Sequence, residues 1–424
     1  MISQKDRSIL RNLAQRQAEL AKCEQNQARK ARWLRHNDAP ANGQGGMPLI
    51  VVEYDTFYED IRPPLICESE LARAMEEQLR TQTMLPDLIG DDRVIPDFYS
   101  VFLDVKIDEF CLPLEKHHAK SGKSVAYQYV HPIVDLQRDF EKLKPSAYSC
   151  DVEKARAYAC AVADVIGDIL PVRLRNNSLL WHFGLTQKVV ALMGMEAYFF
   201  AMYDQPEALH DLMAFLRDDM LRFVQWQESN GLLTPNWGNE HGGSNSFGFT
   251  QQLPSRPIQR DDLLKSATDI RLKDLWLNTN SQETTGVSKD GFVEFVLPYY
   301  REICARAGLV YYGCCEPVHT IFAGALETLP HLRKLSVSAW NQEELLAEQL
   351  RGKHIIYSRK PSPNFIGVGR DLDEVAFCEH IRATLHAAKG LSLEFIFRDI
   401  YTLGGNIPKL KRAVDLTRAC CEGL

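Results

Sequence analysis

The chain has 424 residues, 45% of them hydrophobic, which is long enough to bury a large core in one domain or in two smaller ones. Its 56 acidic and 49 basic residues leave a formal net charge of -7, so no overall basic surface is available to neutralise a nucleic-acid backbone. The chain lacks any run of about 20 apolar residues that could cross a membrane. Its first residues, MISQKDRSILRN, lack the apolar core of a signal peptide. Its eleven cysteines do not show the regular spacing of a disulfide framework. We therefore expect a cytoplasmic protein with reduced thiols and with neither a membrane nor a nucleic-acid partner.

Residues 1–46 predict an N-terminal helical arm and a linker. Leucine and alanine recur at helical spacing up to residue 37, and the stretch NDAPANGQGG then interrupts this pattern. Acidic residues separate the basic ones, so the arm is not typical of a nucleic-acid or membrane segment. We expect a solvated helix that packs on a neighbouring subunit, which would make the protein a homodimer.

From residue 47 to residue 424, short runs of strand character alternate with amphipathic helical stretches. Two of the predicted helices cover residues 206–231 and 292–308. The predicted strands lie at 47–54, 97–105, 178–184, 232–238, 309–315, 333–340, 354–360 and 392–399. Eight strands alternating with helices predict an α/β fold, a (β/α)8 TIM barrel with the N-terminal helices as an extension. In such a barrel the carboxyl ends of the strands and the loops after them build the active site.

The stretch LVYYGCCEPVH, residues 309–319, places two thiols and a carboxylate at one of these strand ends. Spacing alone favours small buried residues, because zinc sites usually show separated cysteines. The position at a strand end favours a metal, and Cys314, Cys315 and Glu316 are the predicted ligands, with zinc as the metal. Neighbouring strand residues point to opposite faces, so one of the two cysteines is expected to be structural.

The long polar loop GNEHGGSNSFGFTQQLPSRP, residues 238–257, is predicted to be either functional or disordered. Its Glu240 and His241, together with Glu283 in NSQETTGVSKDGF, are the predicted catalytic residues, since carboxylates and imidazoles in polar loops can act as acids and bases. The alternative is that all three are solvated loop side chains. The predicted substrate-binding residues lie in or after the other strands: Glu53, His182, Tyr312, Trp340, Arg359, Lys360 and Arg398. For His182, Tyr312 and Trp340, the alternative is packing in the core.

Several segments between residue 47 and the C-terminus resemble the uroporphyrinogen decarboxylase superfamily. They are LTQKVVALMGMEAYFFAMYDQPEALHDLM, SQETTGVSKDGFVEFVLPYYREI, YYGCCEP, HLRKLSVSAW and HIIYSRKPSPN. The likeness is greatest to the cobalamin-dependent methyltransferase-like branch. It implies an enzyme that moves a methyl group between a small methylated donor and a corrinoid carried on a separate protein, with metal assistance. A decarboxylase or lyase that holds a small carboxylate with Arg359, Lys360 or Arg398 remains open, as does a non-catalytic barrel.

Two departures from this family restrict the expected substrate and the expected zinc ligands. The first strand continues as VVEYDTFYED, which is acidic where the decarboxylases carry arginines, so a polyanionic tetrapyrrole is a poor substrate. The zinc-dependent members carry H-x-C after one strand and a cysteine after the last strand. Here Tyr312 or Gly313 stands in place of the histidine, and the last strand is followed by RDIYTLGGN without a cysteine. Zinc would therefore need other ligands, namely Cys314 or Cys315 with Glu316, Glu283 or His241.

Overall fold

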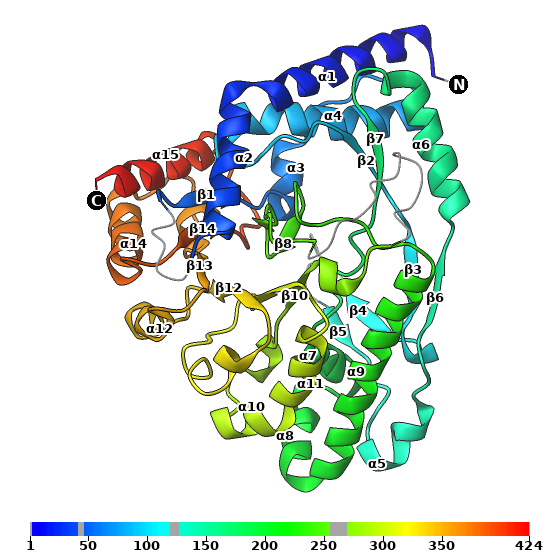
Figure 1. Cartoon of the computed structure of the whole chain (residues 1–424), viewed down its shortest axis with the longest axis vertical. Coiled ribbons are helices and arrows are strands. Elements are labelled where there is room, and N and C mark those ends of the chain that lie inside the picture. The colour runs from blue at the N-terminus through cyan, green and yellow to red at the C-terminus, as the bar shows by residue number, and fades with distance from the viewer. Residues whose placement is uncertain (1, 41–45, 119–126, 255–268, 424) are drawn as a thin grey trace.

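Six parallel strands make the main sheet in this computed structural model, which describes residues 2–40, 46–118, 127–254 and 269–423. Their spatial order is β1–β14–β13–β12–β11–β10, with bounds β1 Leu49–Val52, β10 Trp276–Thr279, β11 Leu309–Tyr312, β12 Leu332–Val337, β13 Ile356–Arg359 and β14 Leu393–Phe397 (Figure 1). Every residue of β1, β10, β11, β13 and β14 is buried, as is typical of parallel strands covered on both faces.

Two further parallel strands, β2 (Tyr99–Phe102) and β7 (Val172–Arg175), pair with each other in a separate sheet. The parallel strands and the helices between them confirm the α/β class. Within the described residues, no strand ladder joins β1 to β2 or β7 to β10, so a hydrogen-bonded closed barrel is not shown.

Two of the predicted strands are wrong. Residues 178–184 form turns rather than a strand, and residues 232–238 contain no strand. In the second run Pro235 has no N–H for a strand ladder. The side chain of Asn236 takes the place of a ladder there, accepting from the Trp276 amide at 2.9 Å and donating to the Trp276 carbonyl at 2.8 Å. The strands that occupy these places in chain order, β7 and β10, were not predicted.

Part of the long polar loop forms a short hairpin, β8 (His241–Gly243) and β9 (Ser246–Phe247). The two turn residues, Ser244 and Asn245, have φ values of 42° and 66°, which suits a tight hairpin turn. Gly243 lies so close to the ring of Tyr311 that a side chain there would come within 2.6 Å of the Tyr311 Cβ atom. The GG pair therefore lets the hairpin pack directly on β11, and residues 255–257 of the predicted loop lie outside the described residues.

The other antiparallel pairs are β3 (Val105–Asp108) with β6 (Ala147–Cys150) and β4 (Lys116–His118) with β5 (Tyr127–Tyr129). The helices are α1 Gln4–Lys22, α2 Glu24–Asn37, α3 Tyr58–Ile61, α4 Glu70–Leu88, α5 Leu136–Asp139, α6 Val152–Ile166, α7 Leu185–Met193, α8 Met195–Asp204, α9 Pro206–Ser229, α10 Lys289–Phe295, α11 Leu297–Cys304, α12 Glu343–Leu350, α13 Asn364–Gly367, α14 Glu374–Ala387 and α15 Pro408–Glu422. The predicted helix at 206–231 is confirmed as α9. The helix predicted at 292–308 is interrupted at Val296, just before Pro298 in the first turn of α11.

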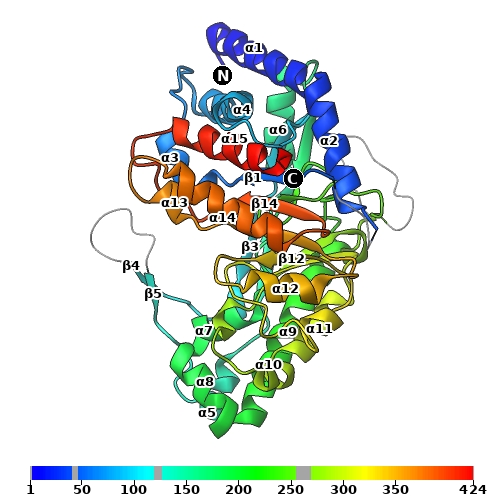
Figure 2. The same cartoon turned by 90° about the vertical axis from the view of Figure 1, so that its left-hand side faces the viewer.

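Two groups of helices lie at opposite ends of the molecule. Figures 1 and 2 both show α1, α2, α4, α6 and α15 at one end, and α7 to α11 at the other end. The main sheet lies between these groups, with α12 and α14 beside it in both views.

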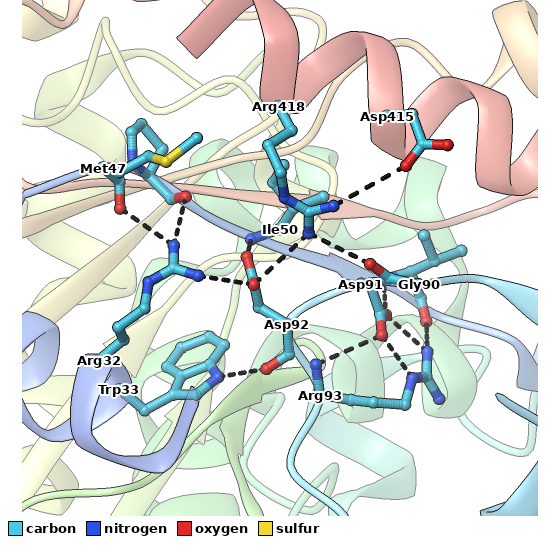
Figure 3. Close-up of polar contacts among 12 residues, drawn as sticks. Arg32, Trp33, Met47, Ile50, Gly90, Asp91, Asp92, Arg93, Asp415 and Arg418 are labelled. Atoms are coloured by element: carbon cyan, nitrogen blue, oxygen red, sulfur yellow. Dashed lines mark hydrogen bonds and ion pairs between the residues drawn. The ribbon is translucent and has the colours of Figure 1, made fainter. Parts of the chain in front are cut away.

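The N-terminal arm packs closely on the rest of the chain. Trp33 of α2 is fully buried, and its indole N–H donates to the Asp92 carbonyl at 2.8 Å. The amide of Asn37 donates to the carbonyls of Phe247 and Phe249 at 2.9 and 2.8 Å. Figure 3 shows that the Asp92 carboxylate also joins Arg32 of α2 to Arg418 of α15. The domain boundary at residue 46 stays a prediction, and residues 41–45 of the linker lie outside the described residues.

Candidate functional site

A cavity of about 360 Å³ lies between β1, β2, the end of β7, the β8–β9 hairpin and β10. Its lining includes apolar side chains and four groups that can carry charge: Arg93, Arg175, Glu240 and His241. A cavity of this size is within the range that binds small molecules. It therefore brings together two of the three predicted catalytic residues, Glu240 and His241, whereas Glu283 does not line it.

Glu240 forms an ion pair with Arg175, which stands at the end of β7. Its other carboxylate oxygen accepts from the Gly238 amide at 3.0 Å. Burial raises the pKa of Glu240, and the positive charge of Arg175 opposes that shift. Burial thus makes this carboxyl group easier to protonate than an exposed one, while Arg175 stabilises its charged form.

His241 begins β8, and its ring packs edge-on against Phe247 with 5.1 Å between ring centroids. Burial lowers its pKa to about 4, and the positive charges of Arg93 and Arg398 act in the same direction. At neutral pH the imidazole is therefore uncharged and can offer one donor and one acceptor.

Two asparagines in the cavity lining carry unused acceptors. Asn278 of β10 donates through Nδ2 to the Leu180 carbonyl at 2.8 Å, which leaves its Oδ1 without a hydrogen-bond partner among the described residues. The Oδ1 atom of Asn245 has no partner within that part of the chain either. Arg93, Arg175 and both asparagines are not among the residues that the sequence predicts for the site. Finding β7 and β10 would have pointed to Arg175 and Asn278.

A second polar cluster gathers where β1, β11, β13 and β14 end. The sulfur atoms of Cys314 and Cys315 lie 3.5 Å apart, and the Cys315 thiol donates to Asp399 Oδ2 at 3.2 Å. The Nζ atom of Lys360 donates to the Cys314 carbonyl at 3.1 Å. Arg398 places its Nε atom 3.4 Å from Asp399 Oδ1. The predicted thiol, lysine and arginine positions therefore do converge, although the cysteines do not line the 360 Å³ cavity.

The two thiols have different acidities. The contact with the Cys315 sulfur lowers the pKa of Cys314, and the charges of Arg398 and Lys360 lower it further against the effect of burial. The same contact and burial raise the pKa of Cys315. Cys314 is therefore the sulfur of the pair that more readily carries negative charge.

Glu53 and Arg398 form the other side of this cluster, with 3.5 Å between Glu53 Oε2 and Arg398 Nε. Glu53 Oε2 also accepts from the Asp399 amide at 3.2 Å. Burial raises the pKa of Glu53. The Nε and Nη1 atoms of Arg398 are buried and make no hydrogen bond within the described residues, although Nε lies within ion-pair distance of Glu53 and Asp399.

The predicted zinc ligands do not form a metal site as they lie. Glu316 is 4% exposed, and its two oxygens accept from the amides of Ser281 and Cys314 at 3.0 and 2.8 Å. The carboxylate thus braces the loop instead of facing a shared centre with the thiols. Across the described residues, no group of three or more histidine, cysteine, aspartate or glutamate side chains is arranged to hold a metal ion. This donor set does not fit zinc.

Several other predicted residues lie in packed surroundings. Glu283 accepts from the Thr186 hydroxyl at 2.7 Å, and burial raises its pKa. His182 packs on Phe223 with 4.5 Å between ring centroids, and burial lowers its pKa. Tyr312 is fully buried against Ser281. These positions support the core alternative for His182 and Tyr312.

The last two predicted substrate contacts lie at opposite extremes of exposure. Arg359 is 1% exposed and donates to the Ser338 carbonyl at 2.7 Å and to Glu343 of α12, so it cannot reach a substrate carboxylate. Trp340 is 74% exposed, which contradicts the core alternative for this residue, and it does not line the cavity.

Comparisons with known proteins add little to this description. No family model matches the chain, and no curated protein sequence matches it. One solved structure, a methyltransferase from Methanosarcina mazei, is similar over 91% of this chain and 98% of its own, with 11% sequence identity and a TM-score of 0.47. A likeness this distant carries no conclusion about activity. In the part of the chain that the structure describes, no helix is both long enough and apolar enough to cross a membrane.

Proposed function

We propose that the protein is a methyltransferase that moves a methyl group between a small methylated compound, bound in the 360 Å³ cavity, and a corrinoid on a separate protein. The observation that carries the proposal is the meeting of Glu240 and His241 on one cavity, where burial biases both toward their neutral forms. The corrinoid part rests on the sequence resemblance to the methyltransferase-like branch.

Glu240 is the proton donor in this mechanism. When a methyl group is transferred from oxygen or nitrogen, the electrons of the broken bond stay on that heteroatom. The heteroatom then takes up a proton. The Glu240 carboxyl supplies the proton, and its Arg175 ion-pair partner stabilises the resulting carboxylate. His241, uncharged at neutral pH, orients the donor by hydrogen bonding.

The methyl acceptor must approach from outside the cavity. Drug-sized ligands fill pockets of about 300–1,000 Å³, and a cavity of about 360 Å³ is too small for a corrinoid macrocycle. A reduced corrinoid supplies a strong nucleophile for the methyl carbon. The residues of this chain then need only hold the donor, exclude water and deliver the proton.

The test uses purified full-length protein with free cob(I)alamin as the acceptor and O-, N- and S-methylated small compounds as donors. Formation of methylcobalamin is followed by absorbance. Glu240→Gln keeps the shape of the side chain but has no acidic proton to donate, so we expect the turnover of this variant to fall by about 100-fold or more. Glu153→Gln, whose side chain is 82% exposed, is the matched control and should retain full activity. Equal rates for Glu240→Gln and the unchanged protein would reject the role of Glu240.

A lyase acting on a small carboxylate is the second candidate. It is favoured by the buried Nη1 atom of Arg398, which lacks a hydrogen-bond partner among the described residues and could donate to a substrate carboxylate. The same preparation, supplied with small carboxylic acids and assayed for released carbon dioxide, separates the candidates. Carbon dioxide release without any methylcobalamin formation would favour the lyase.

A further inference from the structure

The Cys314–Cys315 pair has the geometry of a reactive dithiol. Its sulfurs lie 3.5 Å apart, and Cys315 is partly exposed. The residues around it do not complete a metal site within the described chain. We propose that Cys314 and Cys315 are a redox-active pair that a peroxide oxidises reversibly to a disulfide between neighbouring residues. This inference concerns a modification of the chain and does not depend on the proposed methyl transfer.

The backbone around the pair holds both thiols on the same side. Strand β11 ends at Tyr312, so the alternation that would direct the two side chains to opposite faces has already stopped. Gly313 follows with a φ of 101°, a left-handed conformation that glycine adopts without strain. The Cys314 carbonyl accepts from the Ser336 hydroxyl at 2.6 Å, and the Cys314 amide donates to Glu316 at 2.8 Å. The loop is therefore anchored at Cys314 while the sulfurs remain free to react with each other.

The surroundings of the pair give each sulfur a role. Cys314 stands beside the positive charges of Arg398 and of Lys360, which donates to the Cys314 carbonyl at 3.1 Å, and it attacks one oxygen of hydrogen peroxide. A sulfur–oxygen bond forms, the oxygen–oxygen bond breaks, one water leaves, and Cys314 becomes a sulfenic acid. Cys315 transfers its proton to Asp399, which it contacts at 3.2 Å, and attacks the Cys314 sulfur. The sulfur–sulfur bond forms and the sulfur–oxygen bond breaks. The departing hydroxide takes up a proton as the second water, so the two thiols lose the two electrons that the peroxide gains.

The disulfide formed in this way should be easy to reduce. Cα atoms of neighbouring residues are about 3.8 Å apart, whereas those of ordinary disulfides are about 4.4–6.8 Å apart. A disulfide outside that range is strained, and strained disulfides are the ones that thiols reopen readily. The pair is therefore suited to reversible oxidation and not to permanent crosslinking.

The chain contains its own control for this chemistry. Cys420 and Cys421 are also adjacent, but they belong to helix α15, where successive side chains diverge by about 100°. Trypsin releases both pairs in separate peptides, residues 307–333 and 419–424, and neither peptide contains another cysteine. After treatment of the full-length protein with one equivalent of hydrogen peroxide, we expect the first peptide to lose two hydrogen atoms in mass. The second peptide should keep both thiols, and excess reduced glutathione should restore the first.

Single variants test the assignment of the two sulfurs. Cys315→Ser should leave Cys314 with one added oxygen atom, because the Cys315 sulfur that would displace this oxygen is missing. Cys314→Ser should leave Cys315 largely unoxidised at the same peroxide dose. The proposal is overturned if peptide 307–333 of the unchanged protein keeps both thiols, or if the 419–424 peptide closes to the same extent. It is also overturned if glutathione fails to reopen the disulfide.

Discussion

Burial acts on two neighbouring residues, Glu240 and His241, in the same chemical sense. It raises the pKa of the carboxyl group and lowers the pKa of the imidazole to about 4, so both shifts favour the uncharged form. A cavity wall of this kind makes Glu240 easier to protonate and keeps the His241 imidazole uncharged at neutral pH. This pairing is what the proposed proton delivery from Glu240 requires.

The lowered pKa of His241 predicts a loss of stability in mild acid. The imidazole titrates near pH 4 in the folded protein and near about 6.5 in the unfolded chain, so the unfolded chain binds more protons between these values. The free energy of unfolding should therefore fall as the pH drops from about 6.5 to 4. His241→Gln removes this contribution, and we expect its unfolding free energy to fall by about 2 kcal/mol less than that of the unchanged protein between pH 7 and about pH 4.5. Urea unfolding at the two pH values measures the difference, and equal losses in both proteins would contradict the prediction.

Single site residues are predictable when their neighbours in the chain are distinctive. Glu240 and His241 stand beside glycines in a polar loop, and both line the cavity. Arg93 and Asn278 were missed because each becomes part of the cavity only when its own segment is packed against others. Arg359 is a predicted substrate contact because it lies at the end of a strand, but its side chain binds Glu343 of α12 instead. Chain position does not say to which side a side chain points at a strand end.

At the scale of elements, the free edge of β1 is satisfied by side chains. The amide of Ile50 donates to Asp92 Oδ2 and that of Val52 to Asp91 Oδ2, both at 2.9 Å. Arg93 donates to the Val52 carbonyl, also at 2.9 Å. Figure 3 shows this segment beside β1, with α2 and α15 meeting at Asp92. The acidic segment therefore takes the place of a neighbouring strand, which explains why no ladder between β1 and β2 is found among the described strands.

Asp92→Ala should weaken this edge and both attached helices. The substitution leaves the Ile50 amide without its acceptor and Arg32 without a carboxylate partner in a largely buried place. We expect a loss of about 2–4 kcal/mol in the free energy of unfolding, with faster hydrogen exchange at Ile50 and along α15. Asp87→Ala, at an exposed position of α4, is the control and should change little. Unchanged exchange at Ile50 in Asp92→Ala would argue against this role.

Elements were predictable where the apolar pattern was local and strong. The runs that became β1 (LIVV) and β11 (LVYY) are wholly apolar because both of their faces are covered. In β12, β13 and β14 the apolar residues are interrupted by buried polar ones such as Lys334, Arg359 and Glu394. β7 reads VRLR and was missed, because its arginines reach partners that only the folded chain provides. Residues 178–184 contain a similar apolar cluster but fold into turns, with the Leu180 carbonyl bound to Asn278. Short apolar runs of this kind do not distinguish a strand from a packed turn.

At the scale of the whole molecule, the N-terminal helices are part of the packed structure. His36 and Glu394 are both buried, with 3.3 Å between His36 Nε2 and Glu394 Oε2. Lys334 of β12 donates to the same Glu394 oxygen at 3.0 Å and to the Ser246 hydroxyl at 2.5 Å. One polar cluster thus joins α2, the main sheet and the β8–β9 hairpin. Because that hairpin lines the cavity, the arm supports the site through it.

Removal of residues 2–37 should therefore destabilise the whole protein. The deletion exposes the surface covered by Trp33 and leaves Lys334 and Glu394 open to solvent at one end of the sheet. We expect the melting temperature to fall by about 10 °C or more, and the truncated protein to bind a dye specific for exposed apolar surface. Trp33→Phe, which keeps most of the packing but loses the hydrogen bond to Asp92, should cause a smaller fall. An unchanged melting temperature after the deletion would show instead that the arm is independent of the core.

The sequence by itself determined the alternation of buried strands and helices, and with it the α/β class and the placement of a thiol pair at a strand end. These properties depend on local patterns, since strands buried on both faces are rich in apolar residues. Only the folded chain shows that the parallel strands form two sheets, that Glu316 faces backbone amides rather than a metal, and that Arg175 meets Glu240. Each of these contacts joins segments or side chains whose directions depend on packing between distant elements. No local pattern in the chain encodes such a direction.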